Sequence, residues 1–204
     1  MKAGRNIWLS IFLALIIIFL AAYAAYVERQ GDTPAAQNFE EYTNTTYGFT
    51  FEYPQANTIE STSPQYVAVG EGSGSAFSAQ VAVNVITSDA SEHYASFEQF
   101  AFAQGELQCD ADGPTGSVRC PSIASSTPFQ SSTGLSGELF YLNQVTTTST
   151  TTERSIKGPF IAYNLSKSAS GSPYSGVLIF VPGSISLNEE LVAIVAGSVQ
   201  LQNP

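Results

Sequence analysis

The sequence contains few side chains that could catalyse a reaction. His93 is the only histidine, so metal sites built from several histidines are excluded. A Ser-His-acid triad would depend on this one residue, and no Gly-x-Ser-x-Gly motif is present. A lone histidine just before a helix is usually a surface residue. We therefore expect no catalytic residues and no enzymatic activity. The one enzymatic alternative is a hydrolase that uses His93 with a nearby serine or acid pair.

Two loops have compositions that occur in ligand sites. Asp110-Ala111-Asp112-Gly113 is similar to half of a calcium loop, and Glu106 could add a carboxylate if the chain folds back. The rest of the calcium pattern is absent, which favours a solvated loop. The glycine-rich segment 70–75 precedes a strand and contains Glu71, whereas phosphate loops precede a helix and usually carry a lysine. We expect a flexible hairpin loop there, and neither a metal nor a cofactor.

Residues 7–27 form an uncharged apolar run of 21 residues, long enough to span about 30 Å of hydrocarbon. Trp8 lies near one end, and Tyr23 and Tyr26 lie near the other, where aromatic rings favour the membrane interface. The run predicts a transmembrane helix with these three residues at its interfaces. Residues 1–6 then form a short cytoplasmic tip.

The charges around the run predict its orientation. Lys2 and Arg5 precede it, so the positive-inside rule places the N-terminus in the cytoplasm and the remaining chain outside. Cleavage as a signal peptide is the alternative, because Ala22-Tyr23-Ala24 has the Ala-x-Ala form of a cleavage site. The protein would then be secreted. Both interpretations export the domain.

The exported part is strongly acidic. Beyond residue 27 it has 5 basic residues against 17 acidic ones, a formal charge of −12. Nucleic acids and anionic lipid surfaces both require a basic face, so neither is an expected partner. Only 12% of the whole chain is charged. Serine and threonine hydroxyls therefore provide much of the surface polarity.

Two cysteines are consistent with export. Cys109 and Cys120 have ten residues between them, including Gly113, Pro114 and Gly116, which allow the chain to turn back. An even number of cysteines in an exported domain predicts a disulfide, and two free thiols are the alternative. Closing so short a loop contributes roughly 2–3 kcal/mol in the chain-entropy model.

The pattern of apolar residues predicts an α+β domain over residues 42–204, preceded by an acidic stalk at 28–41. The capping-box sequence Ser96–Gln99 opens one helix, which Gly105 can end, and Ser186–Glu189 opens a second. Hairpin-length links imply an antiparallel sheet of about six strands, with the two helices over one or both faces. The expected strands are 47–53, 66–70, 79–87, 137–148, 154–166 and 175–181.

The segment Tyr42–Pro54 resembles the opening of a PsbP-like domain. That family begins with a tyrosine, a spacer, and then Gly-aromatic-x-Phe-x-Tyr-Pro, and the segment Tyr47–Pro54 matches this motif. The family usually has a tryptophan soon after the proline, whereas Gln55, Ala56 and Asn57 follow here. The resemblance implies an α/β sandwich shared with the Mog family and a non-enzymatic accessory or binding role. It transfers no site residues, because the matched positions are core positions.

Two sequons, Asn44-Thr45-Thr46 and Asn164-Leu165-Ser166, matter only if the host glycosylates exported proteins. Taken together, the sequence predicts a single-pass membrane protein with an extracytoplasmic accessory or binding domain. Its expected partner is another protein of the cell envelope. A structural subunit of a surface filament or layer is the second hypothesis, because the composition is rich in serine and threonine and poor in lysine. The hydrolase is the third.

Overall fold

The computed structural model describes residues 38–89, 92–165, 173–183 and 188–202, and the unit considered below begins at Phe39. The expected cytoplasmic tip, the apolar run with Trp8, Tyr23 and Tyr26, and most of the stalk lie outside these residues. Among the residues that are described, no helix is both long enough and apolar enough to cross a membrane.

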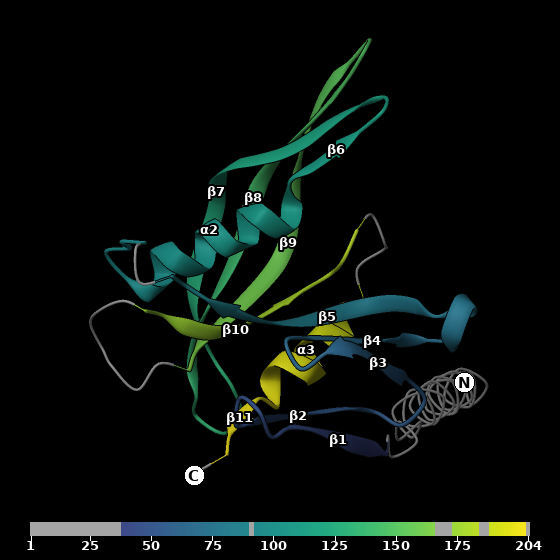
Figure 1. Ribbon diagram of the computed structural model, residues 1–204, viewed down its shortest axis with the longest axis vertical. Coiled ribbons are helices and arrows are strands. Elements are labelled where there is room, and N and C mark those ends of the chain that lie inside the picture. Colours follow the sequence, from purple (N-terminus) through teal and green to yellow (C-terminus); the bar gives the residue numbers. More distant parts are fainter. Residues whose placement is uncertain (1–37, 90–91, 166–172, 184–187, 203–204) are drawn as a thin grey trace, which may run out of the picture. The chain divides into compact units, whose positions relative to one another are not determined.

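The domain has two antiparallel sheets (Figure 1). The smaller sheet has the order β1-β2-β11, and the larger has the order β3-β4-β5-β10-β9-β8-β7-β6. This arrangement confirms the α+β class, although the described residues form eleven strands rather than about six. The strands are β1 Phe39–Asn44, β2 Phe49–Pro54, β3 Thr58–Ser63, β4 Tyr66–Glu71, β5 Ser78–Thr87, β6 Ala111–Gly113, β7 Gly116–Gln130, β8 Ser136–Thr148, β9 Thr152–Asn164, β10 Ser175–Phe180 and β11 Gln200–Leu201.

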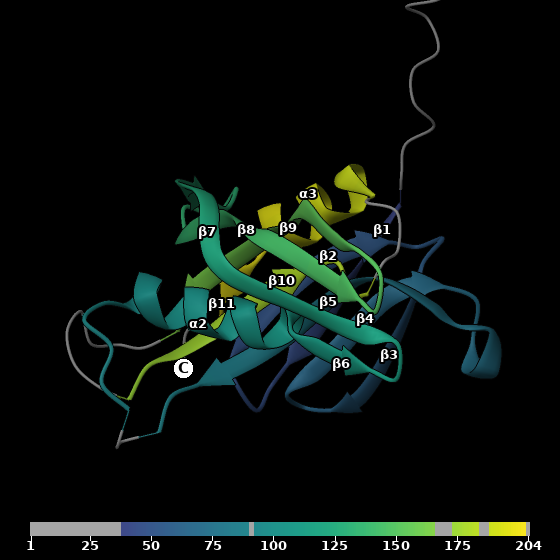
Figure 2. The same cartoon turned by 90° about the horizontal axis from the view of Figure 1, so that it is seen from above.

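Two helices lie on opposite faces of the larger sheet, α2 (Phe97–Cys109) on one and α3 (Glu189–Gly197) on the other (Figure 1 and Figure 2). The alternation of side chains along β10 shows why both are required. Val177 and Ile179 belong to the core cluster with α3 and β2, whereas Leu178 and Phe180 belong to the cluster with α2. A strand that is apolar on both faces must be covered on both faces.

The start of α2 agrees with its expected capping box. Ser96 Oγ accepts a hydrogen bond from the Gln99 amide at 3.2 Å, and Gln99 Oε1 accepts one from the Ala95 amide at 2.8 Å. Its expected end at Gly105 is wrong, because the helix continues to Cys109. A Cβ on Gly105 would lie 2.7 Å from the ring of Phe140. The glycine thus lets α2 approach the sheet closely.

The second helix begins at a different cap from the one expected. Residues 184–187 lie outside the described residues, and the cap that is described is Asn188, whose Oδ1 accepts from the Leu191 amide at 3.1 Å. The buried Tyr163 hydroxyl donates to the carbonyl of Ala196 at 2.6 Å. This hydrogen bond joins the larger sheet to α3.

The strands that the sequence analysis omitted are mostly polar. β7 has 15 residues, most of them exposed. Its many serines, together with Pro121 and Pro128, are more typical of a loop than of a strand. β6 pairs only with the first residues of β7, so the rest of β7 is an edge strand of the larger sheet. Proline is tolerated in an edge strand, because N–H groups on its outer side have no partner strand. β1 begins at Phe39, inside the segment assigned to the stalk. Such strands depend on backbone pairing, which hydrophobic periodicity does not reveal.

Gly105→Ala tests the close approach of α2 to the sheet. Alanine would favour the helix by about 1 kcal/mol, but overpacking against Phe140 costs about 1–3 kcal/mol. We expect a lower melting temperature by circular dichroism. Gly197→Ala is the matched control, because that helical glycine has open space within 4 Å of its Cβ position, and it should melt no lower than the parent. Equal melting temperatures for the two variants would contradict the packing argument.

Candidate functional site

His93 is an exposed residue before α2. Within the described part of the chain, no hydrogen bond or ion pair joins it to a serine or an acid. Ser91, the serine nearest to it in the sequence, lies outside the described residues.

The two cysteines form a disulfide, in agreement with the sequence analysis. It joins the last residue of α2, Cys109, to Cys120 in β7, with a Cα–Cα distance of 5.9 Å. The acids that follow Cys109 are hydrogen-bonded rather than free. Asp110 Oδ1 accepts from the Cys120 amide at 2.8 Å, and Arg119 Nη2 lies 2.6 Å from Asp112 Oδ1.

These contacts bear on the calcium alternative. The carboxylates of Asp110 and Asp112 flank a guanidinium, because Arg119 Nε also lies 3.9 Å from Asp110 Oδ2. No group of three His, Cys, Asp or Glu side chains suited to a metal occurs among the residues that the structure describes. Asp112 lies in the short strand β6, which pairs with β7, and so the segment is a hairpin.

Glu106 lies near the C-terminal end of α2, where the helix dipole disfavours a negative charge. Its pKa is raised, first by burial and second by the negative charge of Asp110. A carboxyl whose pKa is raised by folding destabilises the folded state once the pH rises above its ordinary pKa. The charged Glu106 therefore lowers the stability of the folded domain at neutral pH.

Glu106→Gln should raise the melting temperature at pH 7, because it removes a charge that folding disfavours. The gain should disappear near pH 3, where the parent carboxyl is protonated in both the folded and the unfolded state. Glu98→Gln is the control on the same helix, because Glu98 lies in the first turn and its charge is favourable there. Thermal scans at the two pH values measure the effect, and a gain that persists at pH 3 would exclude the electrostatic cause.

The glycine-rich segment forms the expected hairpin link between β4 and β5, with the short 3₁₀ turn Gly74–Ala76. The Gly74 amide donates to Glu60 Oε1 at 2.7 Å, and Gln80 donates to Glu71 Oε1 at 2.9 Å. One of the backbone N–H groups that a phosphate would need is therefore already hydrogen-bonded to a carboxylate.

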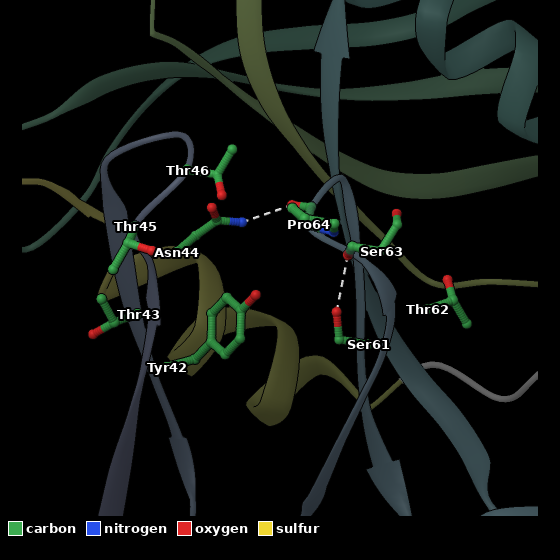
Figure 3. A pocket seen from close by; sticks show the side chains of 9 residues that line it. All are labelled: Tyr42, Thr43, Asn44, Thr45, Thr46, Ser61, Thr62, Ser63 and Pro64. Carbon is green, nitrogen blue, oxygen red and sulfur yellow. Dashed lines mark hydrogen bonds between the residues drawn. The ribbon is translucent and has the colours of Figure 1, made fainter.

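A shallow hollow of about 370 Å³ lies between the β1–β2 turn and the β3–β4 turn (Figure 3). Hydroxyl side chains from both turns line most of it. Asn44 joins the turns, because its Nδ2 donates to the carbonyl of Pro64 at 2.7 Å and its Oδ1 accepts from the Tyr47 amide at 3.1 Å. Asn44 is only 3% exposed, so the folded domain presents this sequon poorly to a glycosylating enzyme. Asn164, the other sequon, ends β9 and is half-buried.

Asn44→Ala and Thr46→Ala both destroy the first sequon, but only the first removes the hydrogen bonds between the turns. We expect Asn44→Ala to lower the free energy of unfolding by about 1–3 kcal/mol, because buried partners lose their bonds. The exposed Thr46 should change it little. Urea unfolding measures both variants. Equal stability for the two would show that Asn44 does not hold the turns together.

A hollow beside the disulfide has a volume of about 540 Å³, and we call it the disulfide cavity. The C-terminal end of α2 and strands β6, β7, β8 and β9 all contribute to its walls. Most of its surface is apolar, and its polar groups come from Gln108, Gln144, Thr146 and one lysine, Lys157. The side chains that line it include those of Cys109, Ala111, Val118, Gln144, Thr146 and Lys157.

Lys157 is half-buried in this cavity, and its ammonium donates a hydrogen bond to the carbonyl of Gly183. Burial lowers the pKa of Lys157, because a charged amine loses hydration there. The sequence analysis did not single out this residue. Its only signal was rarity, since the chain has seven Lys and Arg residues in all.

The strands around the disulfide cavity continue as a projecting ribbon that we call the arm, residues 116–123 and 143–156 (Figure 1). β8 pairs with both β7 and β9 in it, with a register shift in β7 between Arg119 and Ser122, and most of its side chains are exposed. Ile156 is 67% exposed, and Ile123 is 38% exposed. The sequence analysis missed both residues, because an isoleucine in a strand is normally read as core.

No family model and no curated protein matches this chain. Among solved structures, it is similar to the cyanobacterial PsbP of Synechocystis sp. PCC 6803, with 11% identity over 84% of this chain and 96% of that one, and a TM-score of 0.39. A protein of Bacteroides thetaiotaomicron is 12% identical over 76% of this chain and 45% of that one, with a TM-score of 0.29. The expected PsbP-like resemblance is thus confirmed as a distant one.

Proposed function

We propose that the protein is a membrane-anchored extracytoplasmic accessory protein that binds another protein of the cell envelope through its arm. The supporting observation is the arm itself, a three-stranded ribbon that continues past α2 and places Ile156 in solvent at 67% exposure (Figure 1). A ribbon without a core of its own buries little apolar surface. A partner that covers Ile156 would add that burial.

The distribution of charge favours the arm over the rest of the domain as the contact surface. The described part of the chain has three basic residues, and all lie on β7 or β9: Arg119, Arg154 and Lys157. The acids are spread over both sheets and both helices. The body would repel an acidic partner, whereas the arm offers charges of both signs.

One of the two edges of the arm, the β7 edge, favours recognition by side chains rather than by an added strand. Pro121 removes one N–H group from this part of β7, and register shifts interrupt its pairing with β8. Prolines and bulges at an edge discourage the addition of a foreign strand. The exposed face with Ile156 and Arg154 is therefore the surface that a partner would recognise.

A photo-crosslinking amino acid at position 156 tests this proposal in the cells that make the protein. We expect a discrete adduct with an envelope protein, because this position lies inside the proposed interface. Position 107 is the matched control, since Leu107 is also 67% exposed but lies on α2. No adduct at 156, or equal adducts at both positions, would refute the arm as the interface. An adduct of twice the protein's own mass would favour the filament alternative.

A further inference from the structure

We propose that the disulfide cavity binds a small organic monocarboxylate, with the ammonium of Lys157 as the group that recognises its anionic oxygens. The cavity shares Val118, Gln144 and Thr146 with the base of the arm, but the inference does not depend on the arm's partner. It rests on the juxtaposition of one half-buried lysine, apolar walls and a disulfide in a single cavity.

The size and lining of the cavity suit a small molecule. Its volume of about 540 Å³ lies within the range of roughly 300–1,000 Å³ that ligand pockets occupy. Ala111, Val118 and the sulfur of Cys109 provide apolar contacts. Such pockets are mostly apolar and hold a small number of polar groups that orient the ligand.

Lys157 is the polar group that selects charge. Within the described residues its ammonium has one hydrogen-bond acceptor, the Gly183 carbonyl, and no carboxylate forms an ion pair with it. An ammonium has three N–H donors, so two are left for a ligand. An anion placed beside this half-buried ammonium would gain a charge-assisted hydrogen bond and offset part of the hydration that the amine has lost.

The other polar groups limit the ligand to a single negative charge. Gln144 is already engaged, because its Oε1 accepts from Ser155 at 3.0 Å and its Nε2 contacts Cys109 Sγ at 3.6 Å. Glu153 precedes Lys157 by four residues in β9 and therefore lies on the same face of the strand. Asp110 directly follows Cys109 in the sequence. Neither acid lines the cavity, and the one ammonium that does can compensate one carboxylate, so the second charge of a dianion would stay uncompensated.

The walls are held in place before any ligand binds. The disulfide fixes the end of α2 to β7, and the Asp110–Cys120 and Arg119–Asp112 contacts fix the β6–β7 hairpin. A cavity that is already formed loses little conformational entropy on binding. The ligand therefore needs only a short apolar body and one carboxylate.

Calorimetric titration of the full chain in zwitterionic nanodiscs tests the proposal with hexanoate, hexan-1-ol and hexylamine, which share one apolar body. We expect hexanoate to bind about tenfold or more tightly than hexanol, and hexylamine not to bind. Lys157→Met should abolish the preference for hexanoate, whereas Lys157→Arg should keep it. Arg154→Met is the matched control, because Arg154 lies on the same strand but on its opposite face, and it should bind as the parent does.

A second measurement does not depend on the folding of any variant. Bound hexanoate should protect Lys157 from acetylation, seen by mass spectrometry as a lower ratio of label at Lys157 to label at Lys167. Equal affinities for hexanoate and hexanol, an equal loss in Lys157→Met and Arg154→Met, or an unchanged labelling ratio would each overturn the proposal. The crosslinking result at position 156 is separate, so failure of either proposal leaves the other standing.

Discussion

The centre of the larger sheet has to be covered on both faces, and the rest of the structure depends on this constraint. Side chains of β10 alternate between two buried clusters, with Val177 and Ile179 in one and Leu178 and Phe180 in the other. Each helix covers one of these faces, and the β1-β2-β11 sheet completes the cluster around α3. Burial of apolar surface is the main favourable term in folding, so this core determines where the helices must lie.

The close contacts of the helices follow from that requirement. Gly105 allows α2 to pack against Phe140, and the Tyr163 hydroxyl joins the sheet to Ala196 in α3. α2 ends at Cys109, where the disulfide ties it to β7. The paired strands continue beyond this point without a helix over them. The disulfide cavity lies where the cover of the sheet ends, and the arm begins there.

The two proposed sites use different physical properties of the same strands. On β9, Ile156 and Arg154 lie on the exposed face, whereas Lys157 lies on the face that the end of α2 partly covers. The exposed face has area and mixed charge, which suit a protein partner. The covered face has a cavity with apolar walls and a half-buried amine, which suit a small anion. Because side chains alternate along β9, the adjacent residues Ile156 and Lys157 belong to the two different proposed sites.

The sequence by itself determined the elements whose signal is local. The apolar run of β10, the alternation in β2 and β5, the cap at Ser96 and the Cys109–Cys120 pair were all predictable from neighbouring residues. Only the tertiary structure decided that polar β7 is a strand, that Gly105 lies inside a helix, and that Asn44 is buried. It alone brought Lys157 to the disulfide. The reason is physical: an edge strand, a close approach and a cavity all depend on residues far apart in the chain, which meet only through strand pairing and packing.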